Sequence, residues 1–208
     1  MTNYQTQANL FEDHSENAFQ NISGLAYISN YITPEQEVKL LTIIDKQPWL
    51  TDLKRRVQHY GWKYDYTVRR VDESMRLGSL PDWLMEHCQR LHDNGYFPKL
   101  PDQVIINEYQ PGQGTASHTD CIPCFEETIA SISLGSPCVM DFTHSEMKEK
   151  VSVPLEPCSL FILKGDARYK WKHSIAARKT DKVDGQAIQR DRRISLTFRN
   201  VILSEACK

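Results

Sequence analysis

Within the segment from Asp191 to Arg199, polar and hydrophobic residues alternate strictly from Arg193 onward, and this is the clearest local pattern in the chain. Such alternation is typical of a β-strand, because successive side chains of a strand point to opposite faces. One face carries Ile194, Leu196 and Phe198 and requires cover from other elements. The other face carries two arginines and two hydroxyl residues, so the segment predicts a strand with one buried face and one polar face.

From residue 100 onward, short segments with strand patterns are separated by Pro and Gly turns. We expect strands at 103–109, 128–134, 137–142, 151–153, 158–163, 168–175 and 192–201. Two helices precede these strands. The first begins at the capping box Thr33–Gln36, and the second runs from about Pro81 to Asn94 and stops at Gly95.

Each helix has an apolar stripe that can cover the buried face of the 191–199 strand. The expected buried residues are Val38, Leu41 and Ile44 in the first helix and Leu84, Cys88 and Leu91 in the second. Helices followed by a run of short strands predict an α+β fold, in which a double-stranded β-helix (jelly roll) carries two covering N-terminal helices.

The composition suits one enzyme-sized domain, because 208 residues with 40% hydrophobic content can form one large core. Residues 1–20 are polar and lack periodicity, so we expect a flexible tail followed by a single domain over 21–208. No apolar run approaches the roughly 20 residues that span a membrane, and the N-terminus lacks a signal-peptide layout. We therefore expect the cytoplasm, or the nucleus in a eukaryotic cell, with the cysteines reduced.

A candidate metal site consists of His118 and Asp120, separated by one residue, and the later His173. If His118 and Asp120 lie on one strand, they point to the same face and can bind one ion, which His173 completes. Two imidazoles and one carboxylate leave part of the ion open, as in non-haem Fe(II) oxygenases. Structural zinc sites are instead closed by four ligands and are usually rich in thiolates.

A candidate co-substrate site lies on the polar face of the 191–199 strand, which carries Arg193, Ser195, Thr197 and Arg199. Arginine binds a carboxylate in bidentate fashion, so two arginines on one face can hold a short dicarboxylate. Asn107 and Tyr109 share one face of the 103–109 strand and can supply neutral hydrogen bonds. A dicarboxylate beside an open iron site suggests 2-oxoglutarate.

Together these segments resemble the AlkB family of Fe(II)/2-oxoglutarate dioxygenases. The resemblance rests, in this order, on Asn107, Tyr109, the turn Pro111-Gly112, His118, Asp120, His173, Arg193 and Arg199. It implies a jelly roll in which the two histidines and the aspartate hold Fe(II), the arginines hold 2-oxoglutarate, and O2 is the oxidant. The pattern is most similar to the oxygenase domain of the tRNA-modifying AlkB homologue.

The chain departs from the family pattern at two positions. Ile122 stands where DNA-repair members usually carry an acidic residue, which puts their way of recognising bases in doubt. Ser195 stands where the family frequently has an asparagine between the two arginines, so one hydrogen bond to the co-substrate is lost or reassigned.

The segment from Lys54 to Arg70 interleaves cations with aromatic residues. Stacking rings and phosphate-neutralising cations are what an unstacked base requires, and the AlkB resemblance places a nucleotide-recognition lid here. The candidate substrate-binding residues are Arg55, Arg56, Tyr60, Trp62 and Tyr64. A second basic row, in which Arg168, Lys170 and Lys172 alternate with aromatic residues, is expected to meet phosphate. A solvated strand whose rings cover the core is the alternative for the Lys54–Arg70 segment.

The resulting hypothesis is a dioxygenase that hydroxylates or oxidatively dealkylates a nucleobase in DNA or RNA, in nucleic-acid repair or tRNA modification. The same chemistry on a protein side chain, as a hydroxylase or demethylase, is the main alternative. A binding module without turnover and a zinc jelly roll also stay open.

Two short motifs add further hypotheses. Gln7–Phe11 resembles the peptide by which bacterial DNA enzymes dock onto a sliding clamp. Cys121 and Cys124 have a zinc-like spacing, but without a second pair two ordinary loop thiols are favoured.

Overall fold

The computed structural model describes residues 22–51 and 53–203. The strands are β1 Leu25–Ile28, β2 Arg56–Tyr60, β3 Gln103–Tyr109, β4 Thr115–His118, β5 Ile129–Gly135, β6 Cys138–His144, β7 Lys150–Leu155, β8 Leu160–Leu163, β9 Trp171–Ile175, β10 Thr180–Val183, β11 Gln186–Gln189 and β12 Arg193–Arg199. The helices are α2 Pro34–Asp45, α3 Asp82–Asp93 and α4 Gly165–Tyr169, with the 3-10 turn η1 at Glu73–Met75.

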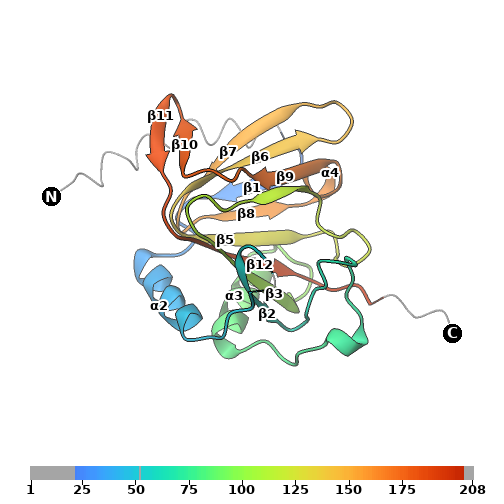
Figure 1. The fold of residues 1–208 in the computed structure, drawn as a ribbon. Coiled ribbons are helices and arrows are strands. Elements are labelled where there is room, and N and C mark those ends of the chain that lie inside the picture. Colours follow the sequence, from blue (N-terminus) through green and yellow to red (C-terminus); the bar gives the residue numbers. More distant parts are fainter. Residues whose placement is uncertain (1–21, 52, 204–208) are drawn as a thin grey trace.

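Two antiparallel sheets face each other and form the jelly roll that the sequence predicts (Figure 1). The larger sheet has the order β1-β8-β5-β12-β3-β2, and the smaller has the order β4-β9-β6-β7. Apolar residues of both sheets, among them Phe161 from β8 and Phe142 from β6, form one core between the layers. Strands β10 and β11 form a separate hairpin.

The helices α2 and α3 cover the outer face of the larger sheet, as the sequence predicts (Figure 1). There Leu84 and Leu91 pack in one cluster with Ile194, Leu196 and Phe198, whose side chains are completely buried. Burying each side chain of this size contributes about 1.5–3 kcal/mol. The helices therefore fix the back of β12 and direct its polar face toward the other sheet.

The buried stripe of α2 differs from the expected one. Val38 is 63% exposed, whereas Leu40 and Ile44 are buried. Leu40 and Ile44 are four residues apart and so share one helix face, and Val38 lies on the opposite side. The expectation for Val38 is therefore wrong, while Ile44 and the partly buried Leu41 agree with it.

Strand β12 is central, because it pairs with β3 on one side and β5 on the other. Leu196, for example, lies opposite both Ile106 and Ile132. Hydrogen bonds on both edges hold the register of β12, and with it the direction in which every side chain of the strand points.

None of the described helices is long and apolar enough to cross a membrane. The sequence motif Gln7–Phe11 and the expected tail over 1–20 lie outside the described residues.

Candidate active site

A cavity of about 320 Å³ lies between the two sheets and collects the expected metal and co-substrate residues. All eight of them line it, namely Asn107, Tyr109, His118, Asp120, His173, Arg193, Ser195 and Arg199. They come from strands β3, β4, β9 and β12 and from the segment that follows β4.

The two histidines face each other across neighbouring strands. His118 at the end of β4 is the register partner of His173 on β9, and their ring centroids are 4.4 Å apart. The Nδ1 atom of His118 lies 2.8 Å from the carbonyl oxygen of Ala116, which can only accept a hydrogen bond. The proton is therefore on Nδ1, and Nε2 keeps the lone pair that a metal ligand needs.

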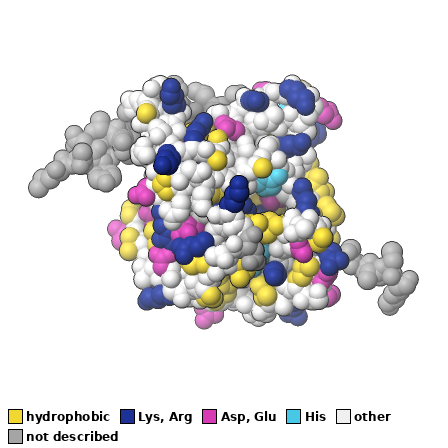
Figure 2. Space-filling model, viewed as in Figure 1, with side chains coloured by type: hydrophobic (Ala, Val, Ile, Leu, Met, Phe, Trp, Pro, Cys, Tyr) yellow, Lys and Arg dark blue, Asp and Glu magenta, His cyan; other side chains and the backbone are white. Residues whose placement is uncertain are grey.

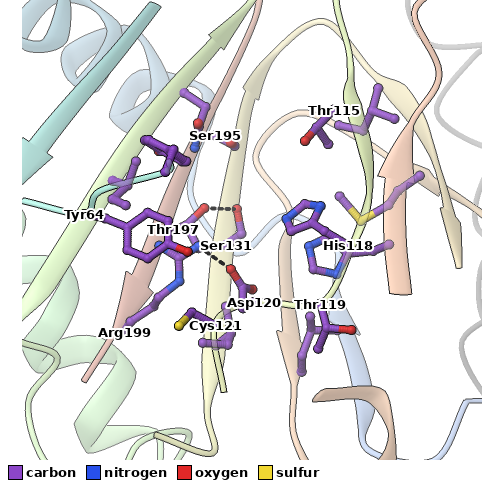
Figure 3. A pocket seen from close by; sticks show the side chains of 18 of the residues that line it. Tyr64, Thr115, His118, Thr119, Asp120, Cys121, Ser131, Ser195, Thr197 and Arg199 are labelled. Atoms are coloured by element: carbon purple, nitrogen blue, oxygen red, sulfur yellow. Dashed lines mark hydrogen bonds and ion pairs between the residues drawn. The ribbon is translucent and has the colours of Figure 1, made fainter. Parts of the chain in front are cut away.

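Asp120 reaches the cavity in a different way from the one expected. Strand β4 ends at His118, so Asp120 lies two residues beyond it and the argument from a shared strand face is wrong. Its carboxylate is held by Arg199, whose Nη2 donates to Oδ1 at 2.8 Å (Figure 3). This ion pair is buried, with the two side chains only 8% and 10% exposed.

The protonation states suit metal binding. Burial alone would raise the pKa of Asp120, but the charges of Arg199, His173 and His118 outweigh it and hold the pKa well below its usual range. Burial, with a further contribution from His118, lowers the pKa of His173 to about 4. At neutral pH the site therefore presents an ionised carboxylate and a neutral imidazole, the forms that bind a metal.

Buried polar atoms without a partner are concentrated at the cavity. Among the described residues, five buried side-chain atoms lack a hydrogen-bond partner, and three of these atoms belong to His173, Arg193 and Arg199. Leaving such a group unpaired costs about 1–3 kcal/mol, and more when it is charged. The Nε atoms of Arg193 and Arg199 can donate hydrogen bonds to an anionic ligand. The Nδ1 atom of His173 can bind a further polar group or ion.

The metal assignment nevertheless rests on chemistry rather than on an assembled cage. Within residues 22–51 and 53–203, no three His, Cys, Asp or Glu side chains are already arranged as a set of metal ligands. Oδ1 of Asp120 is engaged by Arg199, so Oδ2 is the oxygen that can turn toward an ion between the two imidazoles.

The candidate co-substrate residues line the cavity along β12 and β3. Arg193 is 3% exposed, donates from Nη2 to Oγ of Ser133 at 2.9 Å, and lies 5.6 Å from the ring centre of Tyr109. The side-chain oxygen of Asn107 accepts from Nε of Arg55 at 2.9 Å, which leaves its amide group as a donor. Cationic and neutral donors thus meet on one wall, as a dicarboxylate requires.

Comparison with known proteins agrees with this geometry. The family model described as the 2OG-Fe(II) oxygenase superfamily matches residues 24–199. The chain belongs to the 2OG-Fe(II) oxygenase superfamily. The domain is therefore that of a 2-oxoglutarate-dependent dioxygenase.

Within the superfamily, this oxygenase belongs to the AlkB family, as its motifs predicted. It is 36% identical to the Arabidopsis thaliana protein named "Alkylated DNA repair protein ALKBH8 homolog", over 87% of the chain and 59% of that protein. It is 37% identical to the Xenopus tropicalis protein named "tRNA (carboxymethyluridine(34)-5-O)-methyltransferase alkbh8", over 86% of the chain but only 32% of that protein. The chain thus spans about a third to three fifths of the length of these relatives.

A solved structure supports the fold alone. The oxygenase superposes on OsALKBH1 with a TM-score of 0.64 at 17% identity, covering 85% of this chain and 96% of the other.

The segment that the sequence identified as a substrate lid contributes only some of its residues to the cavity. Arg55 and Tyr64 line it. So do Tyr66 and Arg69, which belong to the same Lys54–Arg70 segment but were not among the candidate substrate-binding residues. The rings of Tyr64 and Tyr66 meet edge to face with centroids 4.9 Å apart. The guanidinium of Arg55 lies 5.6 Å from the centre of the Tyr66 ring.

Three expected substrate residues of the oxygenase lie elsewhere. Arg56 forms a bidentate pair with Glu108, and Tyr60 packs against Trp83, both on the helix side of the larger sheet. Trp62 is 8% exposed and belongs to the core. The reason is the register of β2, because Arg56 and Tyr60 share the face that is directed toward the helices. None of these three candidate substrate-binding residues therefore lines the cavity.

The expectation for the second basic row is wrong for Arg168 and for the continuous strand. The expected strand over 168–175 is divided, because α4 ends at Tyr169 and β9 begins at Trp171. Arg168 is only 1% exposed, so of the three cations only Lys170 and Lys172 can meet solvent.

The cysteines beside Asp120 differ from the expected reduced thiols. Cys121 and Cys124 form a disulfide, while Cys88, Cys138 and Cys158 are free and buried. A thiolate is the form that binds zinc, so the bonded pair offers no zinc site. Both sulfur atoms lie 3.3 Å from the carbonyl oxygen of Arg69, so this turn contacts the cavity wall formed by the lid.

Proposed function

We propose that this oxygenase hydroxylates or oxidatively dealkylates a nucleobase in DNA or RNA. The observation that carries the proposal is the wall of the cavity formed by Arg55, Tyr64, Tyr66 and Arg69, in the same cavity as the two histidines. Base–aromatic stacking contributes about 1–3 kcal/mol per base, and the cations add attraction to phosphate.

The remaining residues of the cavity fit the group that the family requires. His118, Oδ2 of Asp120 and His173 would hold Fe(II), which with 2-oxoglutarate and O2 would supply the oxidising chemistry. Arg193 and Arg199 would hold the carboxylates of 2-oxoglutarate. Asn107, Tyr109 and Ser195 would supply neutral hydrogen bonds, the serine in place of the family's asparagine. The chain's own contribution is to bind, orient and desolvate the reactants.

The distribution of charge on the surface favours local contacts with phosphate over attraction of nucleic acid by the whole molecule. The net charge is −2, and Figure 2 shows basic side chains separated by acidic ones on this face rather than a continuous basic patch. The relatives named for alkylated DNA repair and for a tRNA enzyme both favour a nucleic-acid substrate. We therefore propose that the enzyme acts in the cytoplasm, or in the nucleus of a eukaryotic cell.

Succinate release tests the proposal. The enzyme is incubated with Fe(II), 2-oxoglutarate and a panel of methylated DNA, methylated RNA, tRNA and lysine- or arginine-methylated peptides. We expect one nucleic-acid class to stimulate succinate formation above the uncoupled rate. Stimulation by peptides alone would instead favour the protein hydroxylase.

We expect Arg55→Ala to weaken oligonucleotide-coupled turnover roughly tenfold. A tenfold loss corresponds to about 1.4 kcal/mol, which is within the range that a cation beside aromatic rings supplies. The readout is the oligonucleotide concentration at half-maximal succinate formation, measured at two salt concentrations.

Its matched control is Arg56→Ala, the adjacent arginine on the other face. Arg56 pairs with Glu108 and does not line the cavity, so this variant should lose stability. The oligonucleotide concentration at half-maximal succinate formation should stay unchanged. Equal effects of the two substitutions on oligonucleotide dependence would contradict the assignment of Arg55 to the substrate wall.

A further inference from the structure

Arg168 is the largest fully buried side chain of the described residues, with 1% of its surface exposed. It lies in α4, five residues before the candidate metal ligand His173. No ion pair among the described residues includes it, although burial of an unpaired charge is costly. The groups that stabilise this buried charge therefore require an explanation.

Those partners are backbone carbonyl groups of a single segment, 120–126. Nη1 donates to the carbonyl of Asp120 at 3.0 Å, and Nη2 donates to that of Cys121 at 3.2 Å. Further bonds reach the carbonyls of Phe125 at 3.3 Å and Glu126 at 3.5 Å. One guanidinium group thus bonds four carbonyls of the turn that begins at the candidate metal ligand Asp120.

The same side chain also connects two parts of the site. Asp120 lies beyond the end of β4, where no strand pairing fixes its backbone, whereas His173 is held by the pairing of β9 with β4 and β6. Arg168 is carried by α4, which leads directly into β9. Its bonds to the 120–126 segment therefore fix Asp120 relative to the element that carries His173.

We infer that Arg168 is a positioning residue for the metal site, which holds the main chain of Asp120 so that its carboxylate meets His118 and His173. This inference rests on the proposed metal site. Asp120 is then held twice, at its carbonyl by Arg168 and at Oδ1 by Arg199. Groups that orient a metal ligand in this way typically change metal affinity by about 10- to 100-fold.

The shape of the guanidinium explains why lysine cannot replace it. The carbonyls of Asp120 and Glu126 are reached by different nitrogen atoms of a planar fork. Lysine carries its donors on a single nitrogen, so it keeps the charge but cannot span the turn. Arg168→Lys therefore separates the geometry of the side chain from its charge, and Arg168→Met removes both at similar volume.

Metal binding by the full chain tests the inference. Mn(II) is titrated into wild type, Arg168→Lys, Arg168→Met and Asp120→Ala, and the free ion is followed by its electron paramagnetic resonance signal. We expect both Arg168 variants to bind Mn(II) about 10- to 100-fold more weakly than wild type. Raising the Fe(II) concentration should restore most of the succinate formation in Arg168→Lys, since the ligands themselves remain.

Arg90→Lys is the matched control, because Arg90 also donates to a backbone carbonyl and lies over a tyrosine ring, in the helix layer. It should lower the melting temperature and leave the Mn(II) affinity unchanged. Folded Arg168 variants with wild-type Mn(II) affinity would overturn the inference. Loss of cooperative unfolding in both Arg168 variants, even with excess Mn(II), would also overturn it, because the side chain would then serve the fold.

The outcome for the proposed metal site is separate. Wild-type protein that binds no Mn(II), or Asp120→Ala protein that binds it as tightly as wild type, would overturn the metal site itself.

Discussion

Asp120→Ala is expected to abolish succinate formation from 2-oxoglutarate and to weaken Mn(II) binding by more than about 100-fold. The loss should exceed that of an outer-shell partner, which is about 10- to 100-fold, because the substitution removes the only carboxylate of the proposed triad. It also breaks the buried pair with Arg199, so the free energy of unfolding should fall, by up to about 3–5 kcal/mol. The measurements are Mn(II) titration, succinate formation and chemical denaturation.

Asp181→Ala separates the two effects. Asp181 is also buried, at 2% exposure, and accepts hydrogen bonds from Arg178 and Arg190 near the β10–β11 hairpin. Its removal should destabilise the protein to a similar extent without changing Mn(II) affinity. Near-normal succinate formation by Asp120→Ala, or equal loss of metal binding by both variants, would refute the ligand assignment.

The elements that could be predicted from the sequence are those with a different environment on each face, because this difference determines their pattern of polar and apolar residues. Strand β12 lies with its apolar face against α2 and α3 and its polar face in the cavity, so strict alternation follows from its place in the molecule. The helix α3 was equally accessible, because Leu84, Cys88 and Leu91 share one face. The jelly roll followed from these elements and the run of short strands.

Other elements depend on signals that are weaker or that were overlooked. The β10–β11 hairpin turns at Asp184-Gly185, both with positive φ, and this dipeptide is a strong local signal for a two-residue hairpin. The division of 168–175 into α4 and β9 has no such signal, since alternation of cations and rings also fits a strand. Only tertiary contacts show that Arg168 faces inward.

The residues of the candidate site also differ in how well the sequence predicted them. The candidate metal and co-substrate residues could be grouped from the sequence because carboxylate, imidazole and guanidinium groups at these spacings form one chemical set, and all eight line one cavity. The lid residues could not be identified in this way, because a one-residue difference in register decides whether an arginine faces the cavity or the helices. Arg56 is taken by Glu108 on the strand beside it, and no local pattern distinguishes it from Arg55.

Four buried arginines differ in whether their donors are satisfied by the protein. Arg168 and Arg190 bond backbone carbonyls, and Arg190 also holds Asp181, so both are largely satisfied by the protein. Arg193 and Arg199 instead keep an unpartnered buried Nε at the cavity. Arg168 and Arg190 thus have their donors filled by the protein's own groups, whereas Arg193 and Arg199 each keep a donor that a bound anion can fill. This difference marks Arg193 as the residue to test.

Arg193→Lys is expected to raise the concentration of 2-oxoglutarate at half-maximal succinate formation by about 10- to 100-fold. Hydrogen bonds to charged groups contribute about 1.5–3 kcal/mol, and lysine keeps the cation but loses the bidentate fork. Arg193→Ala should raise it further. The maximal rate at saturating 2-oxoglutarate should change much less, since the proposed metal ligands are untouched.

The adjacent Arg192 provides the matched control for Arg193, because its side chain points to the opposite face of the sheet. Arg192 pairs with Asp45 and Glu108 on the helix side, so Arg192→Lys should lower stability and leave the 2-oxoglutarate dependence as in wild type. The stability change controls for any general loosening of β12. If titration gives the same 2-oxoglutarate dependence for wild type, Arg193→Lys and Arg193→Ala, then the carboxylate binds elsewhere and the polar face of β12 serves only the fold.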